Sequence, residues 1–105
     1  MDLFFRLHKP FPSLAAGLPR KVDEAEREFD RRVRDKFPVG SSEAAIKAAL
    51  RQEGWGEPRA YKDMYYVNFT RASSFIMEQS ATIVWKVDEQ GRLTDIRGGY
   101  GLTGL

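Results

Sequence analysis

The stretch FPVGSSEAAIKAALRQEGW, residues 37–55, decides how the first half of this chain folds. Its first residues predict a sharp turn, because Pro38 disfavours helical geometry in the residue before it and Gly40 lets the backbone reverse. Either Ser41 or Ser42 can then accept a backbone N–H group as the N-cap of a new helix. We therefore expect one helix to end near residue 37 and another to begin near residue 42.

The rest of this stretch predicts an alanine-rich helix that ends near residue 53. Gly54 stands where helices commonly finish in a left-handed residue, so we expect Trp55 to fold back on Leu50 in a Schellman cap. Because every side chain has a structural task, we interpret residues 37–55 as a helical corner and not as the mouth of a site.

The preceding residues, about 22–37, predict the first helix of the pair. Apolar side chains recur at intervals of three or four and form one narrow stripe of Val22, Ala25, Phe29, Val33 and Phe37. The spacing also predicts three ion pairs one turn apart, each worth about 0.2–0.5 kcal/mol: Asp23–Arg27, Glu28–Arg32 and Asp30–Arg34. These charges are interpreted as a solvent-exposed face that neutralises itself.

After residue 60 the apolar pattern becomes alternating, which predicts strands at about 61–71, 74–88 and 93–101. One face of the first strand carries Tyr65, Val67 and Phe69. The matching face of the second strand carries Ala81, Ile83, Trp85 and Val87. Gly98 and Gly99 are expected to weaken the third strand, which then frays or kinks near its end.

The turn DEQGRL, residues 88–93, sets the register of the last two strands. A four-residue loop keeps the apolar residues on one face, whereas a shift by one residue sends Ile96 to the polar face. The expected register therefore pairs Asp88 with Leu93, Trp85 with Ile96, and Lys86 with Asp95 as a favourable charge pair.

Together these segments predict an α+β domain in which two N-terminal helices cover one face of an antiparallel β-meander of three or four strands. The predicted core contains Phe29, Val33, Ile46, Leu50, Ile83 and Trp85. Residues 21–105 are expected to form this single domain. Residues 1–20 are expected to form an N-terminal arm, with LFFRL at residues 3–7 as a short strand and no regular structure between residues 10 and 20.

Composition excludes several classes of function. The 105 residues include no cysteine and one histidine, so thiol chemistry, disulfides and metal sites built from cysteines or several histidines are excluded. A formal charge of +2 is too small to indicate nucleic acid by itself. The chain has neither the apolar run of a membrane span nor a signal-peptide pattern. We expect a cytoplasmic protein, or a periplasmic or envelope protein if a signal peptide has been removed.

No constellation of reactive side chains stands out, so we predict a non-catalytic protein without a cofactor, metal or small-molecule ligand. The sheet face opposite the helices is the candidate interaction face, with Met64, Tyr66, Asn68, Thr70, Ile76, Val84 and Lys86. The phenylalanines of the arm, Phe4, Phe5 and Phe11, form a candidate docking arm. The expected partner is another protein or a second copy of this chain.

Single-stranded nucleic acid is the alternative partner of the same face. Residues 62–69, KDMYYVNF, partly match an RNA-recognition signature in which small residues leave room for stacked bases. Asp63 and Tyr65 occupy those small positions, and both predicted helices precede the strands. Tyr66 among basic residues can nevertheless stack a base, so this alternative stays open.

The corner at residues 37–55, followed by VWKVDEQGRLTDIRGGYGLTG at residues 84–104, resembles small bacterial domains of the SmpA/OmlA (BamE-like) type. It is also similar to the helix–helix–sheet repeat of the β-lactamase inhibitory protein. The resemblance covers about residues 22–104 and implies a non-enzymatic envelope or accessory module that binds other proteins. The lipid-bearing cysteine of the outer-membrane members is absent from this chain.

Overall fold

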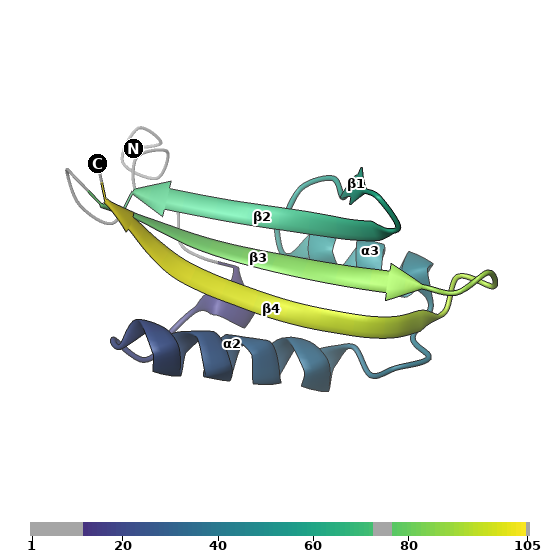
Figure 1. Ribbon diagram of the computed structural model, residues 1–105, viewed down its shortest axis with the longest axis horizontal. Coiled ribbons are helices and arrows are strands. Elements are labelled where there is room, and N and C mark those ends of the chain that lie inside the picture. The colour runs from purple at the N-terminus through teal and green to yellow at the C-terminus, as the bar shows by residue number, and fades with distance from the viewer. Residues whose placement is uncertain (1–11, 73–76, 105) are drawn as a thin grey trace.

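The structure is a computed structural model that describes residues 12–72 and 77–104 (Figure 1). Its elements are η1 (Ser13–Ala15), α2 (Val22–Lys36), α3 (Glu43–Gln52), β1 (Arg59–Tyr61), β2 (Met64–Ala72), β3 (Met77–Val87) and β4 (Leu93–Gly104). The four strands form one antiparallel sheet in the order β1-β2-β3-β4. The α+β class is confirmed, and the meander has four strands.

The helices and the sheet share one core. All six predicted core residues are buried, and they form one cluster with Trp55, Val67, Leu93 and Ile96. Because side chains of α2 and α3 enter the same cluster as the inward residues of β2 and β3, both helices pack on the same face of the sheet. We call this the inner face, and we call the opposite side of the sheet the outer face.

The predicted helical corner is confirmed in detail. Ser42 is the N-cap of α3, and its Oγ accepts a hydrogen bond from the N–H of Ala45 at 3.2 Å. At the other end Gly54 has a φ of +88°, and the N–H of Trp55 donates to the carbonyl of Leu50 at 3.0 Å. These two caps explain why α3 starts and stops where it does.

The three ion pairs predicted for α2 also form. The three expected ion pairs have N–O distances of 3.8, 2.9 and 2.8 Å for Asp23–Arg27, Glu28–Arg32 and Asp30–Arg34. The helix ends at Lys36, one residue earlier than expected, because Phe37 leaves helical geometry in front of a proline.

The described part of the predicted N-terminal arm contains one short helix, which corrects the expectation of no regular structure before residue 20. Leu14 and Ala15 of η1 are buried in the core cluster. The Arg32 guanidinium donates to the carbonyl of Leu14 at 3.2 Å and to that of Ala16 at 2.6 Å. These contacts fasten η1 to α2. The LFFRL segment at residues 3–7 lies outside the described residues.

The first predicted strand, at about 61–71, is wrong at its beginning. The chain forms β1 at Arg59–Tyr61, reverses through Lys62 and Asp63, and continues as β2. Lys62 has a φ of +56°, which non-glycine residues seldom adopt. A Lys-Asp pair is not a recognised signal for a two-residue hairpin, so the alternation does not reveal this reversal.

The β3–β4 register is confirmed at Trp85–Ile96 and is wrong at the turn. Leu93 pairs with Val87 instead of Asp88, and a β-bulge separates this pair from Lys86–Asp95. The loop between the paired residues is thus one residue longer than expected, and the extra residue in β4 restores the register. The bulge also lets both Leu93 and Ile96 face the core, which strict alternation forbids.

The glycines of β4 do not fray the strand. β4 continues to Gly104 and stays paired with β3 along its length. Figure 1 shows α2 running alongside β4, the strand at one edge of the sheet. Gly98 sits where the two elements meet, and its N–H donates to the carboxylate of Asp30 at 2.8 Å.

Candidate interaction face

The structure places most of the predicted interaction residues on the outer face. Val67 of β2 and Ile83 of β3 are buried on the inner face, so the residues that alternate with them face outward. The outward set includes Met64, Tyr66, Asn68, Thr70, Val84 and Lys86. Ile76 lies outside the described residues. No described helix covers this face, because α2 and α3 both pack on the inner one.

The centre of this face is a row of four side chains, one from each strand. Tyr66 and Val84 are direct partners between β2 and β3. Arg59 of β1 stands opposite Tyr66, and Arg97 of β4 stands opposite Val84. Directly opposed residues of antiparallel strands have Cβ atoms about 4.5–5.5 Å apart, so the row is continuous. An apolar pair is thus flanked by a guanidinium on each side.

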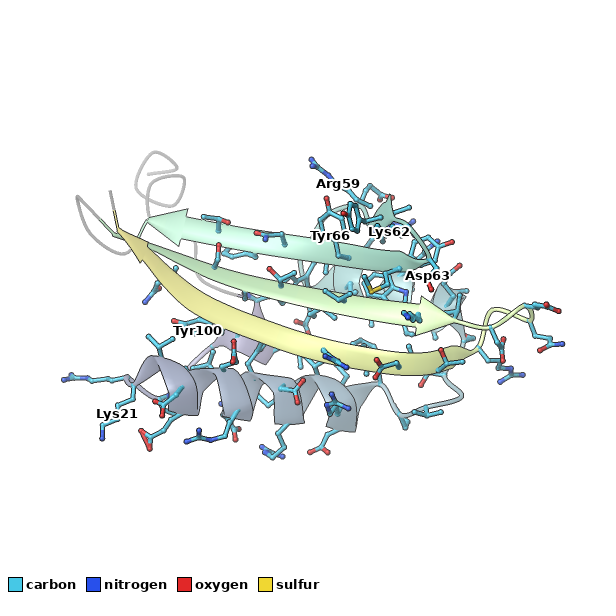
Figure 2. All side chains as sticks on the ribbon, in the orientation of Figure 1. Lys21, Arg59, Lys62, Asp63, Tyr66 and Tyr100 are labelled. Atoms are coloured by element: carbon cyan, nitrogen blue, oxygen red, sulfur yellow. The ribbon has the colours of Figure 1, made fainter. Side chains whose placement is uncertain are left out.

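The next row toward the hairpin ends adds a second aromatic ring. Tyr61 of β1 pairs with Met64 and is 59% exposed. We call Tyr61, Met64, Tyr66 and Val84 the apolar patch. Figure 2 shows Arg59, Lys62, Asp63 and Tyr66 near the β1 end of the sheet.

The predicted charge pair on this face is wrong, although its register is right. Lys86 stands opposite Asp95, but its ammonium group is 3.4 Å from the carboxylate of Asp63 in the β1–β2 turn. The carboxylate of Asp95 lies 3.7 Å from the Nε of Arg97. Asp63 is brought within reach because the chain reverses there, and alternation does not show that reversal.

The other half of the outer face is polar, and its side chains form hydrogen bonds with one another. The amide of Asn68 donates to Thr82 at 2.9 Å, the hydroxyl of Thr70 donates to Asn68 at 2.9 Å, and Thr70 and Ser80 share a hydrogen bond of 2.9 Å. The neighbouring positions on β4 are Gly99 and Gly101, which add no side chain. The structure therefore divides the predicted face into an apolar half and a flat, polar half.

A hollow of about 620 Å³ opens where β1 ends beside β2. We call it the notch, and it is lined by Trp55, Gly56, Glu57, Arg59, Tyr66, Val67, Asn68 and Thr70. Glu57, on its wall, accepts a hydrogen bond from the Arg51 guanidinium at 2.8 Å, and this bond lowers the pKa of the Glu57 carboxyl. Glu57 therefore keeps its negative charge, which the guanidinium of Arg51 balances.

The carboxylates of Asp63 and Asp88 have structural partners. Asp63 and Asp88 line one shallow hollow, but Asp63 is paired with Lys86. The carboxylate of Asp88 accepts hydrogen bonds from the N–H groups of Gln90 and Arg92, both at 2.9 Å, and so holds the β3–β4 turn. In the parts of the chain that the structure describes, no three potential metal ligands gather together.

Three residues of the outer face were not singled out by the sequence: Arg59, Tyr61 and Arg97. The first two belong to β1, which the pattern places in a linker and at the start of a longer strand. Arg97 follows Ile96 in the alternation, so the register alone was enough to place it beside Val84.

The predicted docking arm lies outside the described residues, since Phe4, Phe5 and Phe11 all precede residue 12. Within residues 12–72 and 77–104, no helix has the length and apolarity needed to cross a membrane. Comparison with models of protein families, with curated proteins and with solved structures gave no match.

Proposed function

We propose that this chain is a non-catalytic module that binds another protein, or a second copy of itself, through the apolar patch. The observation that carries the proposal is the direct pairing of Tyr66 with Val84 on the sheet face opposite the helices. A sheet normally buries one face and leaves the other to water, so apolar side chains gathered on the second face favour contact with a partner.

The composition of the patch and its surroundings supports this interpretation. Tyrosine, methionine and arginine are enriched in protein interfaces, whereas lysine and acidic residues are depleted from their centres. Tyr66 and Met64 lie together here, and Arg59 and Arg97 lie at the sides. A complementary partner has an apolar centre with carboxylates around it. The resemblance to SmpA/OmlA-type domains implies the same kind of role.

The proposal is tested by photo-crosslinking in cells that express the full chain. A photoreactive residue at position 61 is expected to capture a partner, whereas the same residue at the exposed position Thr94 on β4 is not. The double variant Tyr66→Glu, Val84→Lys is expected to abolish capture from position 61. If the double variant folds and capture is unchanged, the patch is not the binding surface. Sedimentation of the purified protein separates a second copy from another protein.

Single-stranded nucleic acid is the second candidate because Arg59 and Arg97 flank Tyr66, and Tyr61 offers another exposed ring nearby. Aromatic rings and cations on an open sheet can stack bases and bind phosphates. The order of elements, with α2 and α3 before all four strands, speaks against the RNA-recognition arrangement of residues 62–69. Binding of short oligonucleotides that weakens with salt, and is lost in Arg59→Glu, would favour this candidate.

A further inference from the structure

The edge of the sheet beside the notch is incomplete. β1 has three residues and pairs only with residues 64–66 of β2. Among the described residues, no strand lies beside residues 67–72 on the side away from β3. The chain is not extended just before β1, because Gly56 has a φ of +88°.

The unpaired stretch presents backbone groups to this open side. A two-residue hairpin closes on a hydrogen-bonded pair, here Tyr61–Met64, so hydrogen bonds to β1 recur at every second residue of β2. The N–H and C=O groups of Asn68 and Thr70 therefore point toward the position that β1 would occupy if it were longer. Both residues also line the notch.

The notch has apolar and charged parts that match the two sides of an extended chain. Trp55 and Val67 line it and belong to the core cluster on the inner side. On the outer side stands Arg59, an exposed residue for which the described part of the chain offers no ion pair. Glu57 is already bonded to Arg51. The notch thus offers an apolar floor and one available positive charge.

We propose that an extended segment of a partner protein adds to β2 beside residues 68–72, antiparallel to it and on the same side as β1. Its residue opposite Phe69 is apolar and faces the inner side. Its residue opposite Asn68 is acidic and faces outward, about 7 Å along the strand from Arg59, within reach of the guanidinium. This inference rests on the proposed function and specifies the chemistry of the partner.

Charge complementarity favours a different protein over a second copy of this chain. If the edges of two copies paired, residues 67–72 (VNFTRA) of one copy would face the same residues of the other. That segment contains an arginine and no acidic residue, so it brings no carboxylate to Arg59. An acidic segment from a partner can pair with the open backbone groups of β2 and also bring a carboxylate to Arg59.

The test uses the full chain and the synthetic peptide acetyl-Thr-Val-Thr-Val-Glu-amide, followed by ¹⁵N NMR. Added antiparallel to β2, this peptide places its Glu opposite Asn68. The amide signals of Asn68 and Thr70 are expected to shift. The same peptide with Lys in place of Glu is expected to bind about fivefold more weakly, and Arg59→Glu is expected to reverse that preference.

Two further measurements examine the backbone pairing. Methylation of the peptide nitrogen at Glu removes one ladder hydrogen bond and is expected to abolish the shifts. Thr70→Pro removes an N–H on the open side and is expected to do the same. The proposal is overturned if the peptide does not bind, if the shifts lie elsewhere, or if both charge forms bind equally. It is also overturned if the amides of Asn68 and Thr70 are already protected from exchange without peptide.

Val84→Lys separates this inference from the proposed function, because Val84 belongs to the apolar patch but does not line the notch. If Val84→Lys leaves partner capture intact while the peptide still binds at Asn68 and Thr70, the proposed patch is wrong and the edge site stands. If Val84→Lys abolishes capture and the peptide does not bind, the patch stands and the edge site is wrong.

Discussion

Gly98 of β4 faces Phe29 of α2 so closely that a β-carbon on residue 98 would lie 2.9 Å from the phenylalanine ring. The same atom would lie 3.1 Å from the Cα of Asp30, which cannot move aside without the helix. α2 therefore approaches β4 to a distance that only glycine permits at this position. The glycine that was expected to weaken the strand is the residue that lets the helix pack against it.

The first prediction concerns this contact. Gly98→Ala is expected to lower the free energy of unfolding by about 1–3 kcal/mol, because the new methyl group overpacks the contact between α2 and β4. Gly99→Ala is the matched control, since its β-carbon would meet only a carbonyl oxygen at 4.0 Å. Chemical denaturation of both variants measures the difference. Equal stabilities would show that α2 does not pack this closely.

The second prediction concerns the edge of β4. Asp30→Ala removes the carboxylate that accepts the N–H of Gly98 at 2.8 Å, and it also removes the ion pair with Arg34. We expect a loss of about 1–3 kcal/mol in the free energy of unfolding, since a half-buried donor is left without its acceptor. Arg34→Ala removes only the ion pair and is expected to cost less than about 0.5 kcal/mol. If the two variants are equally stable by urea denaturation, the Gly98 hydrogen bond contributes nothing.

The third prediction concerns the start of α3. Ser42→Ala removes the N-cap hydrogen bond to Ala45 and is expected to cost about 1 kcal/mol of stability. The adjacent Ser41 donates to the carbonyl of Pro38 instead, so Ser41→Ala is expected to have a smaller effect. Thermal unfolding of the two variants side by side provides the measurement. A larger loss of stability in Ser41→Ala than in Ser42→Ala would show that Ser42 is not the N-cap.

The fourth prediction concerns acid stability. Hydrogen bonds from Arg31, and then from Arg32, lower the pKa of Glu28 from 4.5 to about 2. Because the folded-state pKa is the lower one, Glu28 stabilises the fold above pH 4.5, and this contribution is lost as the pH falls toward 2. Glu28→Gln is therefore expected to flatten the loss of stability over this range.

Carboxyl-detected NMR of the native protein should place the Glu28 titration near pH 2, while it remains folded. Asp35→Asn is the control, because it removes the other carboxylate bonded to Arg31 and leaves Glu28 in place. A Glu28 midpoint near 4.5 would show that the guanidinium groups do not hold this carboxylate in solution.

The sequence by itself determined both helices, their caps and the inner and outer faces of the long strands. These features follow from interactions between residues close together in the chain: the stripe around Phe29, the N-cap at Ser42 and the alternation around Ile83. The candidate face could be predicted for the same reason, since Tyr66 and Val84 alternate with buried neighbours.

Only the tertiary structure decided where the chain reverses and which distant residues meet. The positive φ of Lys62 and the bulge next to Leu93 are held by pairing with other strands and by burial of apolar residues, so no local signal marks them. The row from Arg59 to Arg97 joins four strands. The notch exists because β1 is shorter than β2 and pairs with only part of it. These features depend on the lengths and register of paired strands, which are set when the whole sheet assembles on the helices.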